Sequence, residues 1–196
     1  MEQVLSHSCG CGHHVERATQ ILSDEHRVIE RVLTALDELT RRPVVESAAH
    51  WEKALEFFRN FADKCHHFKE EKVLFPAMEE QGIPADGGPI GMMLMEHEQG
   101  RAYVRAMSAC IARVQSQDRA AIDSLLGDAK AYIRLLREHI QKEDEILFPM
   151  ADNVIPPDEH KHLLNSFAEH EAVEMGAQTH ERYLEIARQL ESAVRS

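Results

Sequence analysis

Two stretches of the chain place a glutamate four residues after a histidine: Glu71 follows His67, and Glu143 follows His139. On an α-helix, residues four apart lie on one face, one turn from each other. Each stretch would therefore present an imidazole and a carboxylate side by side, and each continues into Leu-Phe-Pro. A single pair of this kind is common on helix surfaces, so one pair alone does not indicate a metal site.

A further histidine precedes each pair at almost the same distance. His26 lies 41 residues before His67, and His97 lies 42 residues before His139. The order of a histidine followed by His-x-x-x-Glu therefore occurs twice, which indicates an internal duplication of a helix pair. The duplicated pattern predicts six metal ligands: His26, His67, Glu71, His97, His139 and Glu143.

Four imidazoles and two carboxylates are enough to hold two metal ions, with the carboxylates spanning both. Mixed nitrogen and oxygen ligands with unfilled positions suit non-haem iron, and manganese or zinc would also bind. Zinc alone more often uses a single tetrahedral set of ligands. The pattern therefore favours a two-iron centre.

Apolar residues recur at helical spacing in five stretches, and glycine and proline lie mostly between these stretches. We predict helices over residues 17–40, 47–80, 89–116, 119–152 and 158–194. Pro76 should kink or break the second of these helices. The sequence thus predicts an all-α protein, with an up-down-up-down four-helix bundle over residues 17–155. Residues 156–196 are expected to add a fifth, C-terminal helix that packs on the bundle.

The first sixteen residues differ in composition from the rest of the chain. Gly10 and Gly12 oppose helix formation, and histidine and cysteine are crowded around them at positions 7, 9, 11, 13 and 14. We expect residues 1–16 to form a flexible tail. A metal-capturing role is the alternative, although ligands this close in sequence are badly placed for a closed tetrahedral site.

The composition limits the partners of the protein. The formal net charge of −12 makes nucleic acid an unfavourable partner, because an acidic surface repels a phosphate backbone. No apolar run approaches the roughly 18–20 residues that a membrane span needs, and the N-terminus lacks a signal pattern. We expect a soluble, cytoplasmic protein with no membrane partner, and a homodimer is left open.

Ferritin-type bundles are the nearest rival, but they use Glu-x-x-His, with the glutamate first. The order of ligands here, with the phrases His-Phe-x-x-Glu and His-Ile-x-Lys-Glu, resembles the hemerythrin-like (HHE cation-binding) domain over roughly residues 18–152. This resemblance implies a di-iron centre with an oxo or hydroxo bridge that binds O2, nitric oxide or peroxide. By matching position, the four histidines would be terminal ligands, and Glu71 and Glu143 would bridge the two ions.

The sequence departs from the oxygen-carrying hemerythrins at one position. Those proteins have a second histidine four residues before the third-helix ligand, where this chain has Met93. A thioether is a poor ligand for hard, oxidised iron, so water or another group must occupy the position. The candidates are His66, Glu70, Glu30 and His180. Asp144 also competes with Glu143 as a bridge, because a bridging aspartate holds that place in oxygen-carrying hemerythrins.

Three functions are compatible with such a centre. The first is binding or sensing of O2 or nitric oxide. The second is an enzyme that consumes peroxide or nitric oxide. The third is iron handling, as a buffer or donor, for which the Cys/His-rich tail is the only support in the sequence. Whether the protein is an enzyme is therefore left open by the sequence.

Overall fold

The structure is a computed structural model that describes residues 17–114, 116–175 and 179–195. Every secondary-structure element within these ranges is a helix, so the prediction of an all-α protein is confirmed. The tail predicted over residues 1–16 lies outside the described residues. None of the helices in the described ranges has the length and hydropathy that a membrane crossing requires.

The helices follow the predicted order along the chain. α1 spans Ala18–Leu39, and α4 spans Pro89–Val114. A second helical run consists of α2 (Ala48–Phe57), the π-helical segments η1 (Phe58–His67) and η2 (Glu70–Leu74), and α3 (Phe75–Glu80). A third run consists of α5 (Arg119–Lys142), the π-helical segment η3 (Glu143–Leu147) and α6 (Phe148–Val154). The predicted bounds of these runs differ from the observed ones by only a few residues.

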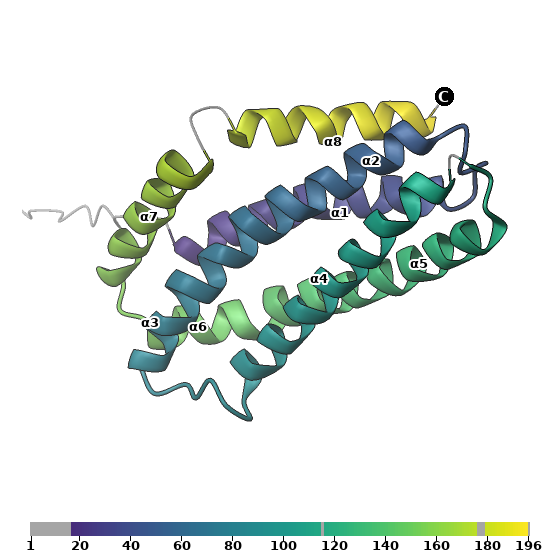
Figure 1. Ribbon diagram of the computed structural model, residues 1–196. Helices are drawn as coiled ribbons and strands as arrows, with labels where there is room; N and C mark the ends of the chain where they lie inside the picture. Colours follow the sequence, from purple (N-terminus) through teal and green to yellow (C-terminus); the bar gives the residue numbers. More distant parts are fainter. Residues whose placement is uncertain (1–16, 115, 176–178, 196) are drawn as a thin grey trace, which may run out of the picture.

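Four long helical rods lie side by side (Figure 1). α1 contacts α2 and α5, and α4 contacts the same two helices, so the four rods close around a common interior. The loop of residues 81–88 contains Gly82 and Gly87, both with positive φ, a conformation that glycine adopts without the usual steric cost. This loop joins α3 to α4 at one end of the molecule.

Two apolar clusters fill the interior on either side of a polar layer. Along α1, Leu22 belongs to one cluster and Ile29 to the other, and the buried His26 lies between them. Along α4, Met93 and Val104 belong to different clusters in the same way. Since burying a large aliphatic side chain stabilises a fold by about 1.5–3 kcal/mol, the two clusters hold the helices together above and below the polar layer.

The sequence predicts a kink or a break at Pro76, and the helical run does not break there. The helical run continues to Glu80, and Pro76 lies in the first turn of α3, directly after the π-helical segment η2. Pro149 occupies the same place in α6, directly after η3. A proline has no N–H to donate, and the start of a helical turn is where that missing donor costs least. A change of helical type before each proline therefore lets both runs continue.

The prediction of one C-terminal helix is wrong. α7 spans Glu159–His170, the π-helical segment η4 spans Glu171–Met175, and α8 spans Thr179–Arg195. α7 lies across one end of the rods, whereas α8 runs along α1 and α2 in a different direction (Figure 1). Four residues on one face of α8 are buried: Tyr183, Ile186, Ala187 and Leu190.

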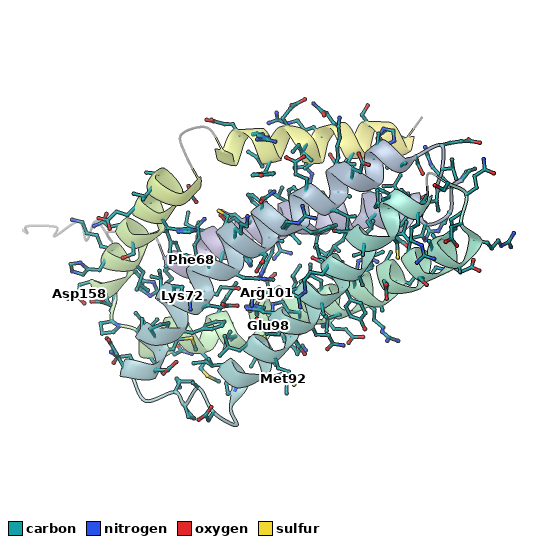
Figure 2. All side chains as sticks on the ribbon, in the orientation of Figure 1. Phe68, Lys72, Met92, Glu98, Arg101 and Asp158 are labelled. Atoms are coloured by element: carbon teal, nitrogen blue, oxygen red, sulfur yellow. The ribbon has the colours of Figure 1, made fainter. Side chains whose placement is uncertain are left out.

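Two of the C-terminal histidines have structural roles. The N–H of Ala18, at the start of α1, donates to Nδ1 of His160 at 3.2 Å. Nε2 of His170 donates to the carbonyl of Lys64 at 2.8 Å, and its ring stacks on Phe68 with 3.5 Å between centroids. α7 therefore packs on the helical run that carries His66 and His67. Phe68 is labelled in Figure 2 beside α7.

Candidate metal centre

Two groups of buried side chains at the centre of the bundle have the composition of metal sites. The first group contains His67, Glu70, His97 and His139, and the second contains His26, His66, Glu70 and Glu143. Within each group, one donor atom from every residue lies within 4.8 Å of the others. Glu70 belongs to both groups, so the two sites are adjacent and share a carboxylate.

Every helical run contributes to the centre. His26 comes from α1, His97 from α4 and His139 from α5. The π-helical segments carry the remaining members, with His66 and His67 at the end of η1, Glu70 in η2 and Glu143 in η3. π-Helical turns are rare and are often found at functional sites, and here they carry both carboxylates of the centre.

The carboxylate of Glu70 lies between imidazoles of the two groups. Its Oε1 is 3.4 Å from Nε2 of His66, and its Oε2 is 3.4 Å from Nε2 of His97. Neither oxygen of Glu70 makes a hydrogen bond to any described residue. The two oxygens therefore face the two groups, one toward each.

Glu143 occupies an equivalent place on the opposite side of the centre. Its Oε2 is 3.2 Å from Nε2 of His26 and 3.2 Å from Nε2 of His139, two histidines that belong to different groups. The contact to His26 crosses between α1 and η3, so Glu143 also joins the two groups.

The outward nitrogen of each histidine faces a different carboxylate. The distances from Nδ1 are 2.9 Å from His26 to Asp144, 3.0 Å from His66 to Glu25, 2.8 Å from His97 to Glu71, 3.0 Å from His139 to Glu96, and 3.6 Å from His67 to Asp63. The first four distances are hydrogen bonds that the imidazole donates, and the last is too long for one. A donor bond at Nδ1 fixes the tautomer and leaves Nε2 free to bind a metal.

Several buried nitrogen and oxygen atoms of the centre lack a complementary hydrogen-bond partner among the described residues. Nε2 of His26, Nε2 of His66 and the carboxylate oxygens of Glu70 and Glu143 make no hydrogen bond within the described parts of the chain. The Nε2 atoms of His97 and His139 are 3.1 Å apart, which brings two acceptors together unless a proton or a cation is shared. Buried polar atoms are normally satisfied, so this arrangement fits cations at the centre.

The pKa values of the histidines show the charge imbalance of the metal-free centre. Burial opposes protonation of His66, but Glu70 and Glu25 outweigh it and raise the pKa of His66 to about 10. Burial likewise opposes protonation of His139, and Glu143 and Glu96 raise its pKa to about 9. Protons therefore balance the buried carboxylates in the absence of metal, and a bound cation would displace them.

The structure brings Glu70 into the two groups in place of Glu71. Glu71 faces outward, where its Oε1 accepts from Nδ1 of His97 at 2.8 Å and from Arg101 at 2.6 Å. Glu70 is four residues after His66 and three after His67, so it lies between the two histidines on the helix surface. This shared position explains why Glu70 reaches both groups.

The sequence contains a signal for this register. Leu-Phe-Pro begins four residues after Glu143 and four residues after Glu70, but only three after Glu71. A lysine also directly precedes Glu70 and Glu143, as Lys69 and Lys142. The repeated phrase is therefore His-x-x-Lys-Glu, which aligns His66 with His139 and leaves His67 as an extra histidine.

The four predicted histidines His26, His67, His97 and His139 all lie in the two groups, together with His66. Met93, which precedes His97 by one turn of α4, lies in an apolar cluster and contributes no ligand atom to either group. The third imidazole of the first group comes instead from His67 on the neighbouring helical run. His67 therefore supplies the imidazole that a histidine in place of Met93 would have added.

The other candidates from the sequence lie outside the two groups. Asp144 accepts from Nδ1 of His26, so it orients a histidine and is not among the central atoms. Glu30 is partly exposed, with Arg137 3.5 Å away. The side chain of His180 lies outside the described residues. Glu25, Asp63 and Glu96 were missed, although Glu25-His26 and Glu96-His97 occur at equivalent places of the repeat.

The sequence of the chain matches the model of a known protein family. The model of the hemerythrin HHE cation-binding domain matches residues 17–151. The chain therefore belongs to this family, and the resemblance seen in the sequence is confirmed.

The individual proteins that resemble this chain share only a modest fraction of its residues. The chain is 27% identical over 157 residues to the uncharacterized protein Rv1995 of Mycobacterium tuberculosis (strain ATCC 25618 / H37Rv) and to the uncharacterized protein Mb2018 of Mycobacterium bovis. These matches cover 79% of this chain and 61% of each relative, so the chain spans about three fifths of their length. It is also 32% identical over 88 residues to the iron-sulfur cluster repair protein YtfE of Dickeya chrysanthemi (strain Ech1591). This match covers 44% of this chain and 40% of that protein. No solved structure matches the chain significantly.

Proposed function

We propose that this protein is a non-haem di-iron protein of the up-down-up-down hemerythrin type that binds or senses O2 or nitric oxide. The observation that carries the proposal is the sharing of Glu70 between two buried groups of histidine and carboxylate ligands. Glu143 supports it, because its Oε2 lies 3.2 Å from one histidine of each group. Mixed imidazole and carboxylate donors suit iron, and manganese or zinc would bind the same atoms.

The proposed ligand sets are unequal. The imidazoles of His67, His97 and His139 would hold one ion, and those of His26 and His66 would hold the other. Glu70 and Glu143 would span both ions. The ion held by two histidines would keep more open positions, which suits binding of a small external ligand. Iron in such a site would supply the capacity to bind diatomic ligands, and the chain would orient the ligating side chains.

The carboxylates around the centre determine how it is held. Asp144, Glu25, Glu71 and Glu96 each accept a hydrogen bond from a histidine Nδ1. These bonds direct Nε2 inward and make the imidazoles more basic. The apolar clusters above and below shield the centre from water on these two sides. An oriented ligand set of this kind favours ligand binding over free exchange of the metal.

Two alternatives belong to other classes. One is an enzyme that consumes peroxide or nitric oxide, and a cavity that reaches His67 favours it by offering access to the centre. The other is an iron buffer or donor, and the name of the YtfE relative, an iron-sulfur cluster repair protein, favours it. Turnover of peroxide would identify the enzyme, and rapid iron loss to a chelator would identify the donor.

The test is the metal content and visible spectrum of the protein purified aerobically after iron-replete expression. We expect about two iron atoms per chain, absorption in the near ultraviolet from a bridged di-iron centre, and a reversible spectral change when nitric oxide is added to the reduced protein. Stoichiometric haem, or a protein without bound metal, would contradict the proposal. Conversion of peroxide over many cycles would replace it with the enzymatic alternative.

A further inference from the structure

A cavity of about 200 Å³ lies between the second helical run and α4. His67, a member of the first metal group, lines it, and so does Tyr132 of α5. His67 is only 5% exposed, and its Nδ1 makes no hydrogen bond to a described residue. The cavity therefore connects the surface with the histidine that belongs to the metal centre.

The cavity exists partly because α4 has a glycine at this point. Gly100 is buried in the middle of α4, where glycine costs about 1 kcal/mol relative to alanine. A Cβ atom at position 100 would meet Cε2 of Tyr132 at 3.6 Å, an ordinary contact, and nothing else within 4 Å. Alanine is therefore tolerated at this position, whereas a longer side chain would extend into the cavity.

The walls of the cavity combine apolar and charged groups. Phe58 and Val104 contribute apolar surface, and Arg59, Arg101 and Arg105 contribute three guanidinium groups. Asp63 contributes one carboxylate, which is paired with Arg101. Arg101 is already used, because it donates to Asp63, Glu71 and Glu98. Arg101 and Glu98 are labelled on α4 in Figure 2.

The other two arginines are available to a ligand. Arg59 donates to the hydroxyl of Ser108 at 2.8 Å, and Arg105 has no hydrogen bond or ion pair among the described residues. Both are exposed at the cavity, in a protein whose formal net charge is −12. A pair of arginines without carboxylate partners in so acidic a protein is a site for an anion, because guanidinium groups match carboxylate geometry.

The size of the cavity exceeds what a diatomic ligand needs. An apolar cavity of about 150 Å³ already holds benzene. We propose that this cavity binds a small organic carboxylate, with its apolar body against Phe58, Val104 and Tyr132 and its charge on Arg59 and Arg105. The bound carboxylate would lie beside His67, where it controls access to the first metal group. The position beside a metal rests on the proposed function, whereas the binding itself does not.

The test uses benzoate and its neutral analogue benzamide, titrated into the purified full-length protein and followed by calorimetry and ligand-observed NMR. Benzoate should bind saturably, with a dissociation constant near or below about 1 mM for a ligand of this size. Benzamide should bind at least about tenfold more weakly, because it lacks the charge that the arginines recognise. Absence of saturable benzoate binding, or equal affinity for benzamide, would overturn the proposal.

Variants locate the site. Arg59→Gln combined with Arg105→Gln should weaken benzoate binding by about tenfold or more, and both positions are exposed, so the variant should fold. Gly100→Leu should abolish binding by filling the cavity, whereas Gly100→Ala should preserve it. Arg188→Gln, at an exposed arginine of α8, is the matched control and should leave the affinity unchanged. Equal affinity in the double variant and the wild type would overturn the proposal.

Iron analysis of the same samples separates the two hypotheses. Benzoate binding with this pattern in a protein that takes up no iron would contradict the proposed function and leave the carboxylate site intact. Two iron atoms per chain without benzoate binding would support the proposed function and overturn the carboxylate site.

Discussion

Glu25 accepts a hydrogen bond from Nδ1 of His66 at 3.0 Å, although the two residues are 41 positions apart and lie on different helices. Glu25 is also paired with the fully buried Lys69. Burial would raise the pKa of Glu25, but His66 and Lys69 lower it to about 2. Glu25 is therefore a charged, buried group that fixes the direction of a histidine at the metal centre.

The same relationship recurs in the second half of the repeat. Glu96 on α4 accepts from Nδ1 of His139 at 3.0 Å and is paired with Lys142. Its surroundings are more open, since the side chains of Glu96 and Lys142 are 11% and 32% exposed. Replacing Glu96 therefore disturbs the histidine with less effect on folding than replacing Glu25.

We predict that Glu96→Ala lowers the metal affinity by about tenfold to a hundredfold, as loss of the carboxylate behind a metal-bound histidine usually does. The measurement is competition with a chelator of known affinity, together with thermal unfolding. Glu185→Ala, at an exposed glutamate of α8, is the control and should change neither. An unchanged affinity in Glu96→Ala would show that the hydrogen bond to His139 has no part in metal binding.

Glu70 and Glu71 should respond differently to replacement. Glu70→Ala should lose both ions, because one carboxylate is shared by both groups. Glu71→Ala should keep about two iron atoms per chain, with weaker binding, because Glu71 accepts from the outward nitrogen of His97. Elemental analysis of the two purified variants measures the difference. If Glu71→Ala were empty and Glu70→Ala full, the bridging role would belong to Glu71.

The sequence alone was sufficient to predict the all-α fold and four of its helical runs from apolar periodicity. The duplicated pattern also selected four histidines that the structure buries together, and the two-ion centre stays a prediction. The register of Glu70 was missed because two neighbouring residues on a helix differ by only about 100° in direction. Packing against α1 and α4 decides which of them faces inward. In the sequence, only the spacing to Leu-Phe-Pro and the preceding lysine mark Glu70 as the counterpart of Glu143.

Other features depended on contacts between distant segments. Glu25 contacts His66 on another helix, and its role depends on where those two helices meet. His160 and His170 of the C-terminal region bind backbone groups of α1 and η1. A histidine that satisfies a buried backbone atom cannot be distinguished by sequence from one that binds metal, so these roles required the structure.

His67 should be the ligand that compensates for Met93. His67→Ala should weaken binding of the ion in the first group, because that group then has two imidazoles in place of three. Met93→Leu should keep both ions and cost less than about 1.5 kcal/mol, since it conserves volume in an apolar cluster. Iron content and unfolding of both variants provide the measurement. Full iron content in His67→Ala together with iron loss in Met93→Leu would reverse the two roles.

The C-terminal helices should act on the centre through α7 and η4. Lys69, which directly precedes Glu70, is paired with Glu171 of η4, and its Nζ lies 5.7 Å from the ring centroid of Phe167 on α7. α8 packs farther along α1 and α2, where Leu190 is fully buried. The two parts of the C-terminal region therefore contact different stretches of the bundle.

We predict that Phe167→Ala and Leu190→Ala both destabilise the protein, by about 3–5 and 2–5 kcal/mol respectively, because each removes a buried side chain and leaves a cavity. Only Phe167→Ala should accelerate iron loss to a chelator, because only Phe167 packs on the side chain next to Glu70. Chemical denaturation measures stability, and the rate of iron transfer is measured below the unfolding range of both variants. Equal rates in the two variants would assign the whole C-terminal region to packing, whereas a faster rate in Phe167→Ala alone would show that α7 protects the metal centre.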